Sequence, residues 1–267
     1  MDDFKTVTVT YEDQVATVTM GAAKPGSGGN IHWDLGVAFN ALRDNNAVRV
    51  IVLTGAGDNF RIAPSSRQGE GNGERNRDPA WHWQTFTGIL RTHQVMAEIE
   101  KPIIAKVNGD AIGFGQSVMF GCDFIIARED AVIMDHHMGG LFEGIYDGVR
   151  EPGGSGLSNV PGDGGAALVP LLMSPYKAKE YLMLTEPYTA RQLADMNIIN
   201  HAVPADQLDA KVAEFTTRLL SKSAYALART KRIINRRIVE QLNLTLDASV
   251  AYEMVTMMQP SDIKTLG

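Results

Sequence analysis

The chain has 267 residues, of which 44% are hydrophobic and 21% are charged, and its formal net charge is −6. This composition is typical of a folded globular protein and excludes a disordered chain, which would be poorer in apolar residues. The acidic balance argues against a general nucleic-acid-binding surface, and the single cysteine excludes an internal disulfide and a cysteine-based zinc site. No apolar run approaches the roughly 18 residues of a membrane span. The N-terminus also lacks the segments of a signal peptide, so we expect a cytoplasmic protein.

The first half of the chain predicts strands that alternate with helices. Two runs of alternating apolar and polar residues flank Asp13-Gln14, which predicts a β-hairpin over residues 7–19. Helices are predicted over 33–44, 81–99 and 115–120, and buried strands over 48–53, 103–107, 124–127 and 132–134. This alternation indicates an α/β protein.

The second half predicts helices after a long glycine-rich segment. Residues 67–79 and 139–165 are rich in glycine, and we expect both to be irregular segments beside the functional site. Beyond Ala166, helices are predicted over 175–184, 189–196, 205–220 and 223–258, with a short strand over 202–204.

Several motifs, in their order along the chain, resemble those of the crotonase superfamily of enoyl-CoA hydratase/isomerase-like proteins. They occupy residues 48–60, 101–115, 122–123, 161–165, 178–185 and 190–204. The resemblance extends over about residues 7–258 and implies a ClpP-like ββα spiral with a C-terminal helical region that forms trimers or dimers of trimers. We therefore expect a catalytic core over residues 1–200 and an oligomerisation region over 201–267.

The resemblance also implies a chemistry. Members of the superfamily bind an acyl-CoA thioester and stabilise its enolate with two backbone N–H groups, an arrangement that favours developing negative charge. Coenzyme A is then part of the substrate, and we expect neither a separate cofactor nor a metal ion. The expected ligand is a small acyl-CoA or a related carbonyl compound, with no membrane or nucleic acid as partner.

One of the two N–H donors is identified from Gly113-Phe114-Gly115, which aligns with the family's Gly-Gly-Gly run at a helix N-terminus. The Phe114 N–H is the expected catalytic donor, because every residue except proline has one. Gly113 and Gly115 would let a substrate approach the backbone closely. The alternative is that these glycines only permit a tight turn from strand to helix.

The position of the other donor falls on a proline. The family pattern Phe-x-Ala-Gly-x-Asp aligns with residues 60–65, and the donor position coincides with Pro64, which has no N–H. Either a one-residue shift makes Ser65 the donor, with Ala63 beside it in the substrate-binding loop, or this half of the oxyanion hole is altered.

The two glutamates that hydratases of the family use are also replaced. The first position is Ser117, and the second aligns with His137. A histidine can replace a carboxylate as an acid or base because its pKa is near neutral. Asp163, in Pro-Gly-Asp-Gly, is the expected partner that orients it; the alternative is a turn-forming aspartate. His136 and Asp135 are weaker candidates, and Asp135 is expected to brace the turn.

This His/Asp pair resembles the active site of 6-oxocamphor hydrolase, a superfamily member that cleaves a cyclic β-diketone without coenzyme A. His32 and Glu253 match two further active-site residues of that enzyme, whereas another of its histidines falls on Phe114. Alternatively, His32 only starts a helix and Glu253 is one of many solvated helical glutamates.

Two other features contribute to the expected pocket. The aromatic segment 81–86, with Trp83, is expected to form a wall of the acyl pocket or, alternatively, ordinary core packing. Residues 138–160 resemble an insertion that either covers the site or forms a surface loop. A basic cluster on the C-terminal helix could meet CoA phosphates or RNA, or could be a solvated face; its residues are Arg229, Lys231, Arg232, Arg236 and Arg237.

Three functions remain open on the sequence alone. The first is an enoyl-CoA hydratase/isomerase-type enzyme that stabilises an enolate with the Phe114 N–H and uses His137 with Asp163. The second is a retro-Claisen C–C hydrolase of a cyclic β-diketone or ring CoA ester. The third is a non-catalytic or RNA-binding member of the fold.

Overall fold

The computed structural model describes residues 4–21, 29–60, 78–138 and 159–257. A six-stranded sheet in the order β1-β2-β3-β4-β6-β9 forms its centre. β1 and β2 pair antiparallel as the expected hairpin, and every other neighbouring pair is parallel. The strands span Val7–Glu12, Val15–Met20, Val50–Gly55, Ile103–Val107, Phe124–Arg128 and His201–Val203.

A second, three-stranded sheet holds the elements that lead into the site. Its order is β5 (Ala111–Ile112), β7 (Val132–Met134) and β8 (Tyr188–Thr189). β5 and β7 are parallel, so their carboxyl ends lie side by side. Neither β5 nor β8 is predicted from the sequence, because two residues are too few to produce a periodic pattern.

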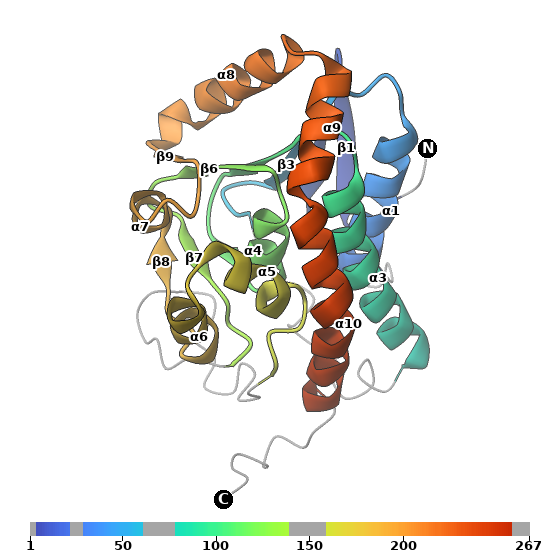
Figure 1. Ribbon diagram of the computed structural model, residues 1–267, viewed down its shortest axis with the longest axis vertical. Coiled ribbons are helices and arrows are strands. Elements are labelled where there is room, and N and C mark those ends of the chain that lie inside the picture. Colours follow the sequence, from blue (N-terminus) through green and yellow to red (C-terminus); the bar gives the residue numbers. More distant parts are fainter. Residues whose placement is uncertain (1–3, 22–28, 61–77, 139–158, 258–267) are drawn as a thin grey trace, which may run out of the picture.

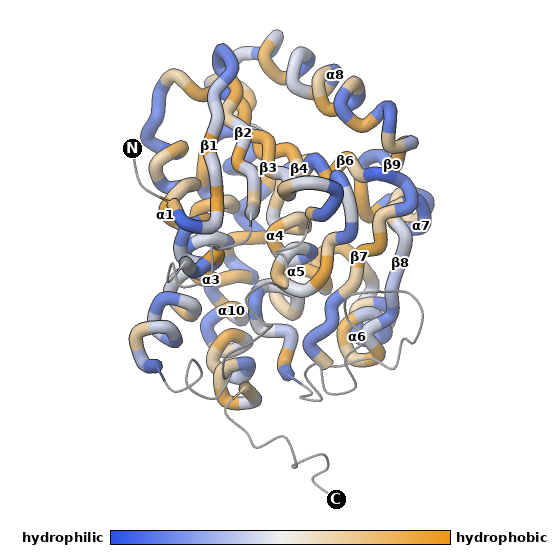
Figure 2. The backbone as a smooth tube through the Cα atoms, turned by 180° about the vertical axis from the view of Figure 1, so that it is seen from behind, coloured by the Kyte–Doolittle hydropathy of each residue, from blue (hydrophilic) through white to orange (hydrophobic). Residues whose placement is uncertain are grey.

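Helices cover both faces of the larger sheet. On one face, α1 (Ile31–Asp44) packs against α3 (Pro79–Glu98), and the long α10 (Arg236–Met257) runs beside α3 (Figure 1). On the other face, α8 (Leu208–Leu220) packs on β3, β4 and β6. Strands buried on both faces need apolar residues throughout, and β3 is buried at all six positions. The central strands β3, β4 and β6 are accordingly mostly hydrophobic (Figure 2).

The remaining α-helices lie between these elements along the chain. They are α4 (Phe114–Phe120), α5 (Gly165–Leu172), α6 (Pro175–Met183), α7 (Ala190–Asp195) and α9 (Ala224–Ile234). α9 and α10 are separate helices, although a single helix was predicted over 223–258. The break lies at Asn235, whose side-chain amide donates to the Ala97 carbonyl at the end of α3.

The C-terminal helices pack on the core as well as extending from it. α10 contacts α3 and α5, and β9 is an edge strand of the larger sheet. None of the helices in the described part of the chain is long and apolar enough to cross a membrane.

Candidate active site

The site lies where β5 and β7 end together. β5 leads into Gly113, whose N–H donates to the carbonyl of Met134 at the end of β7, 3.0 Å away. This bond extends the parallel ladder by one residue. It fixes the start of α4 beside the segment Asp135-His136-His137, which directly follows β7.

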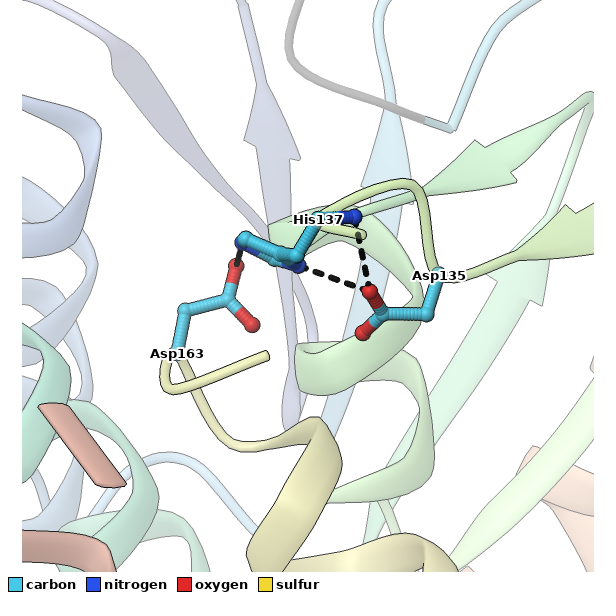
Figure 3. Close-up of side chains that lie close together, drawn as sticks. All are labelled: Asp135, His137 and Asp163. Carbon is cyan, nitrogen blue, oxygen red and sulfur yellow. Dashed lines mark hydrogen bonds and ion pairs between the residues drawn. The ribbon is translucent and has the colours of Figure 1, made fainter. Parts of the chain in front are cut away.

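His137 lies between two buried aspartates (Figure 3). Its Nδ1 is 2.8 Å from Asp135 Oδ1, and its Nε2 is 3.4 Å from Asp163 Oδ2. The backbone N–H of His137 also donates to Asp135 Oδ1, 3.0 Å away, so Asp135 both closes the turn and orients the ring. The expected pair of His137 and Asp163 is thus close in space, while Asp135 makes the shorter contact with the ring.

Glu253 completes the cluster from α10. Its Oε1 lies 3.5 Å from His137 Nε2, on the same side of the ring as Asp163. The Glu253 side chain is buried, and its Oε2 has no hydrogen-bond partner among the described residues. More than 100 residues of sequence separate Glu253 from His137, and the packing of α10 on α5 brings them together.

Burial alone would lower the pKa of His137, but the negative charges of Asp135 and Asp163 outweigh this effect. Together with hydrogen bonds from the ring, they raise the pKa of His137 well above its usual value. This shift favours the imidazolium form of the ring, in which one N–H is directed at each aspartate. This charge state also explains how two carboxylates are tolerated in the interior.

The pKa values of the two carboxylates facing Nε2 shift in opposite directions. Burial would raise the pKa of Asp163, but the His137 charge and the Ser117 hydroxyl, whose Oγ donates to Asp163 Oδ1 at 2.7 Å, lower it below its usual value. For Glu253 burial dominates and raises the pKa, with the charges of Asp163 and Asp135 adding to the effect against that of His137. Glu253 is consequently the more basic of these two carboxylates.

Phe114 and His32 pack against each other near the starts of α4 and α1. Phe114 is the first residue of α4, so its N–H has no acceptor within the helix. The His32 ring lies 4.2 Å from the Phe114 ring, and Asn30 caps α1 and approaches His32 Nδ1 at 3.2 Å. Gly113 has φ +58°, and a Cβ there would lie 2.3 Å from His136 Cε1, so the position requires glycine.

His93 supports Asp163 and was missed by the sequence analysis. This α3 residue is fully buried, and its Nε2–H donates to the Asp163 carbonyl at 2.7 Å. Burial lowers the pKa of His93, so its ring is neutral. The sequence does not mark His93, because an ordinary core residue would occupy the same position on the buried face of the helix. Its role in holding Asp163 is visible only from their contact, which joins residues 70 positions apart.

The contact between His93 and the Asp163 carbonyl requires a glycine at position 164. The φ of Gly164 is +124°, and a Cβ would lie 2.3 Å from His93 Nε2. Gly164→Ala should therefore lower the free energy of unfolding by more than about 1 kcal/mol in denaturant titrations. Gly57→Ala is the matched control, since Gly57 has φ +64° but open space around it. Equal losses in the two variants would contradict the proposed packing against His93.

Other predicted residues lie outside this cluster or outside the described residues. Trp83 is 59% exposed, with its ring 5.1 Å from that of Trp33. Ala63, Pro64 and Ser65 lie outside the described residues, as does most of the insertion over 138–160. Gly115 is buried within α4.

Three members of the basic cluster are engaged in ion pairs. Arg229 makes two hydrogen bonds to Glu100, at 2.7 and 2.9 Å, and Arg232 binds the same carboxylate. Lys231 is buried, and its Nζ lies 2.7 Å from Asp123 Oδ2. These three side chains tie α9 to the core, which limits the charge they can offer to an external anion.

The aspartates and His137 also offer ligand atoms within 4.8 Å of one another, a spacing that could hold a metal ion. Each ring nitrogen faces a different aspartate, however, so a cation between them would have to replace a ring proton. The arrangement is suited first to holding and moving protons.

Comparison with known proteins defines the class. The structure has the crotonase fold: it superposes on an enoyl-CoA hydratase/isomerase from Mycobacterium paratuberculosis with a TM-score of 0.80, at 24% identity over 98% of this chain and 97% of that one. The sequence model of the enoyl-CoA hydratase/isomerase family matches residues 28–149 and 155–263. The chain belongs to this family and is an enoyl-CoA hydratase/isomerase-like enzyme.

Individual relatives carry different activities in their names. A crotonyl-CoA hydratase from Syntrophomonas wolfei is 26% identical over 81% of this chain and 74% of its own. A carnitinyl-CoA dehydratase from Salmonella typhi is 28% identical over 74% of this chain and 68% of its own. A β-diketone hydrolase from the cyanobacterium Anabaena, bound to (S)-3-oxocyclohexyl acetic acid, has a TM-score of 0.75 at 23% identity, over 95% of this chain and 94% of its own.

Proposed function

We propose that this enzyme adds water to one carbonyl of a cyclic β-diketone and cleaves the bond between that carbonyl carbon and the α-carbon that separates the two carbonyls. The observation that carries the proposal is the cluster of His137 with Asp163 and Glu253 on one side of its ring. The glutamate pair of a hydratase is absent, since Ser117 and His137 occupy those positions. The printed activity of the Anabaena neighbour is consistent with this chemistry.

Glu253 is the proposed general base. Its carboxylate is buried and has a raised pKa, so it accepts a proton more readily than an exposed glutamate. It takes a proton from water while the water oxygen forms a bond to the carbonyl carbon. The His137 imidazolium, 3.5 Å from Glu253, keeps the carboxylate ionised before the reaction and stabilises the negative charge that develops during it.

The second step releases an enolate. The bond between the attacked carbon and its α-carbon breaks, and the electron pair becomes the enolate of the remaining ketone. The Phe114 N–H is the proposed donor to the enolate oxygen. The proton held by Glu253 returns to the α-carbon, so one diketone and one water give one keto acid.

Enolate chemistry on an acyl-CoA thioester is the second candidate. It is favoured by the family match and by the hydratase and dehydratase names of the relatives. In that case the Phe114 N–H would receive the thioester oxygen, and coenzyme A would be part of the substrate. The non-catalytic, RNA-binding alternative has less support, because three residues of the basic cluster are bound to acidic partners.

Turnover of two substrate classes separates these candidates. Purified enzyme is incubated with bicyclic and monocyclic 1,3-diketones and, separately, with crotonyl-CoA. We expect loss of the diketone absorbance with formation of a keto acid, and no hydration of crotonyl-CoA. Hydration of crotonyl-CoA without diketone turnover would refute the hydrolase proposal and favour the thioester candidate.

We also propose that the enzyme is a homo-oligomer, as expected from the sequence, and that it works in the cytoplasm. The C-terminal helices expose large apolar side chains: Ile233 at 72%, Ile234 at 65% and Leu244 at 72%. Large apolar side chains exposed on two consecutive helices support an interface there. The double variant Ile233→Glu/Leu244→Glu should shift the mass measured by light scattering from that of a trimer or hexamer to that of a monomer. A double variant at exposed polar residues, Asp206→Lys/Lys222→Glu, serves as the control. A monomeric wild type would contradict this proposal.

A further inference from the structure

The side chains around His137 form a closed, buried ring of polar contacts. Gln116 Nε2 donates to Asp135 Oδ2 at 3.1 Å and to Ser117 Oγ at 2.9 Å, and the Ser117 hydroxyl donates to Asp163 Oδ1 at 2.7 Å. His137 closes the ring between the two aspartates, at 2.8 and 3.4 Å. Gln116 is thereby connected to both carboxylates that flank the imidazole.

The orientation of the Gln116 amide is fixed from its other end. The hydroxyl of Tyr181, on α6, donates to Gln116 Oε1 at 3.1 Å. Both side chains are fully buried. Since the carbonyl oxygen is held by a donor, the two amide N–H groups face the two acceptors.

The backbone of α5 leaves little space for the ring to rearrange. A Cβ on Gly165, the first residue of α5, would lie 2.6 Å from Asp135 Oδ2 and 3.2 Å from Gln116 Nε2. The glycine therefore allows the helix to approach the contact between Gln116 and Asp135 closely.

We propose that Gln116, anchored by Tyr181, is a positioning residue that keeps Asp135 and Asp163 aligned on opposite nitrogens of His137. This inference rests on the proposed function of the cluster. Gln116 is buried and acts through the aspartates rather than on the substrate. One of its N–H groups donates to Asp135, and the other fixes the Ser117 hydroxyl that binds Asp163.

Loss of the Gln116 donor should change the pKa of His137. The dipole of its N–H reduces the negative potential that Asp135 exerts on the imidazole. Without it, the pKa of His137 should rise further. The other groups that face His137 are Asp163, Glu253 and the His136 ring, 5.2 Å away, with His32 and His93 around the aspartate.

Two variants test the inference, and a third is the matched control. Gln116→Leu removes the amide at similar volume, and Tyr181→Phe removes only the hydroxyl that orients it. Tyr188→Phe makes the same change in a tyrosine whose ring stacks on Tyr181 at 6.0 Å, but from which no hydrogen bond to Gln116 is seen. Tyr181→Phe keeps the test valid if Gln116→Leu fails to fold.

The primary readout is the ¹⁵N titration of the His137 ring in substrate-free protein labelled at its six histidines. His137→Asn identifies the signals of His137. We expect the titration midpoint to move upward in Gln116→Leu and in Tyr181→Phe, and to stay in place in Tyr188→Phe. With a substrate that the enzyme turns over, kcat should fall about tenfold in Tyr181→Phe with KM unchanged, the effect of one lost hydrogen bond.

The outcomes separate this inference from the proposed function. A shifted His137 titration without diketone turnover by the wild type keeps the positioning role and refutes the hydrolase. Diketone turnover with titrations that coincide in wild type, Tyr181→Phe and any folded Gln116→Leu refutes the positioning role alone.

Discussion

Replacing Glu253 by glutamine should lower kcat for the diketone substrate by about 10²- to 10⁴-fold, the usual contribution of a general base. The amide has nearly the same shape but cannot accept the proton of the attacking water. Binding of the substrate does not depend on this proton transfer, so KM should change little. Steady-state kinetics of the purified variant measure both constants.

The pH profile gives the Glu253 prediction a second test. The base must be ionised, so kcat/KM of the wild type should fall as pH decreases through the raised pKa of Glu253, above the ordinary glutamate value of about 4.3. Glu240→Gln is the control, because Glu240 lies exposed on the same helix. An unchanged kcat in Glu253→Gln would exclude this residue as the base.

Replacing His137 by asparagine should have the largest effect on stability. It removes the cation between buried carboxylates, and leaving such charges uncompensated typically costs about 3–5 kcal/mol of unfolding free energy. Activity should fall as well, because nothing would then balance the negative charge around Glu253. Denaturant titrations of wild type and variant at pH 6 measure the loss.

The pH dependence of this loss follows from the direction of the shift. The pKa of His137 is higher in the folded than in the unfolded protein, where it is about 6.5. Its stabilisation is therefore fully present below pH 6.5 and is lost as pH rises through the folded pKa. The difference between wild type and His137→Asn should shrink over that alkaline range.

His93→Asn is the control, because the pH dependence of its stability loss should run in the opposite direction. The pKa of His93 is lowered in the fold, so its contribution is present above pH 6.5 and is lost as pH falls. If the losses in His137→Asn and His93→Asn followed pH in the same direction, the assignment of an imidazolium to His137 would be wrong.

Most of the fold could be predicted from the sequence, because its longer elements carry strong patterns. The buried strand over 103–107 was predicted with the bounds that the structure has. Short elements such as β8 were missed, since pairing with β7 rather than local sequence defines them. The break at Asn235 also depends on a distant contact, with Ala97.

The site was predictable only where a motif marked it. His137, Asp163 and Glu253 came from resemblance, and the structure places them together. Asp135 was expected only to brace the turn, although it also contacts the imidazole two residues away, whereas the contributions of Gln116 and His93 depend on side-chain contacts between separate elements. No spacing along the chain indicates such contacts.

The fate of water oxygen tests the central claim most directly. The wild-type enzyme is incubated with a cyclic 1,3-diketone in H₂¹⁸O, and the product is analysed by mass spectrometry. The mechanism predicts a ring-opened keto acid whose carboxylate gains one ¹⁸O per turnover, with loss of this product in Glu253→Gln. Recovery of intact diketone from the wild type, together with ¹⁸O-labelled 3-hydroxybutyryl-CoA when crotonyl-CoA is supplied, would contradict the account.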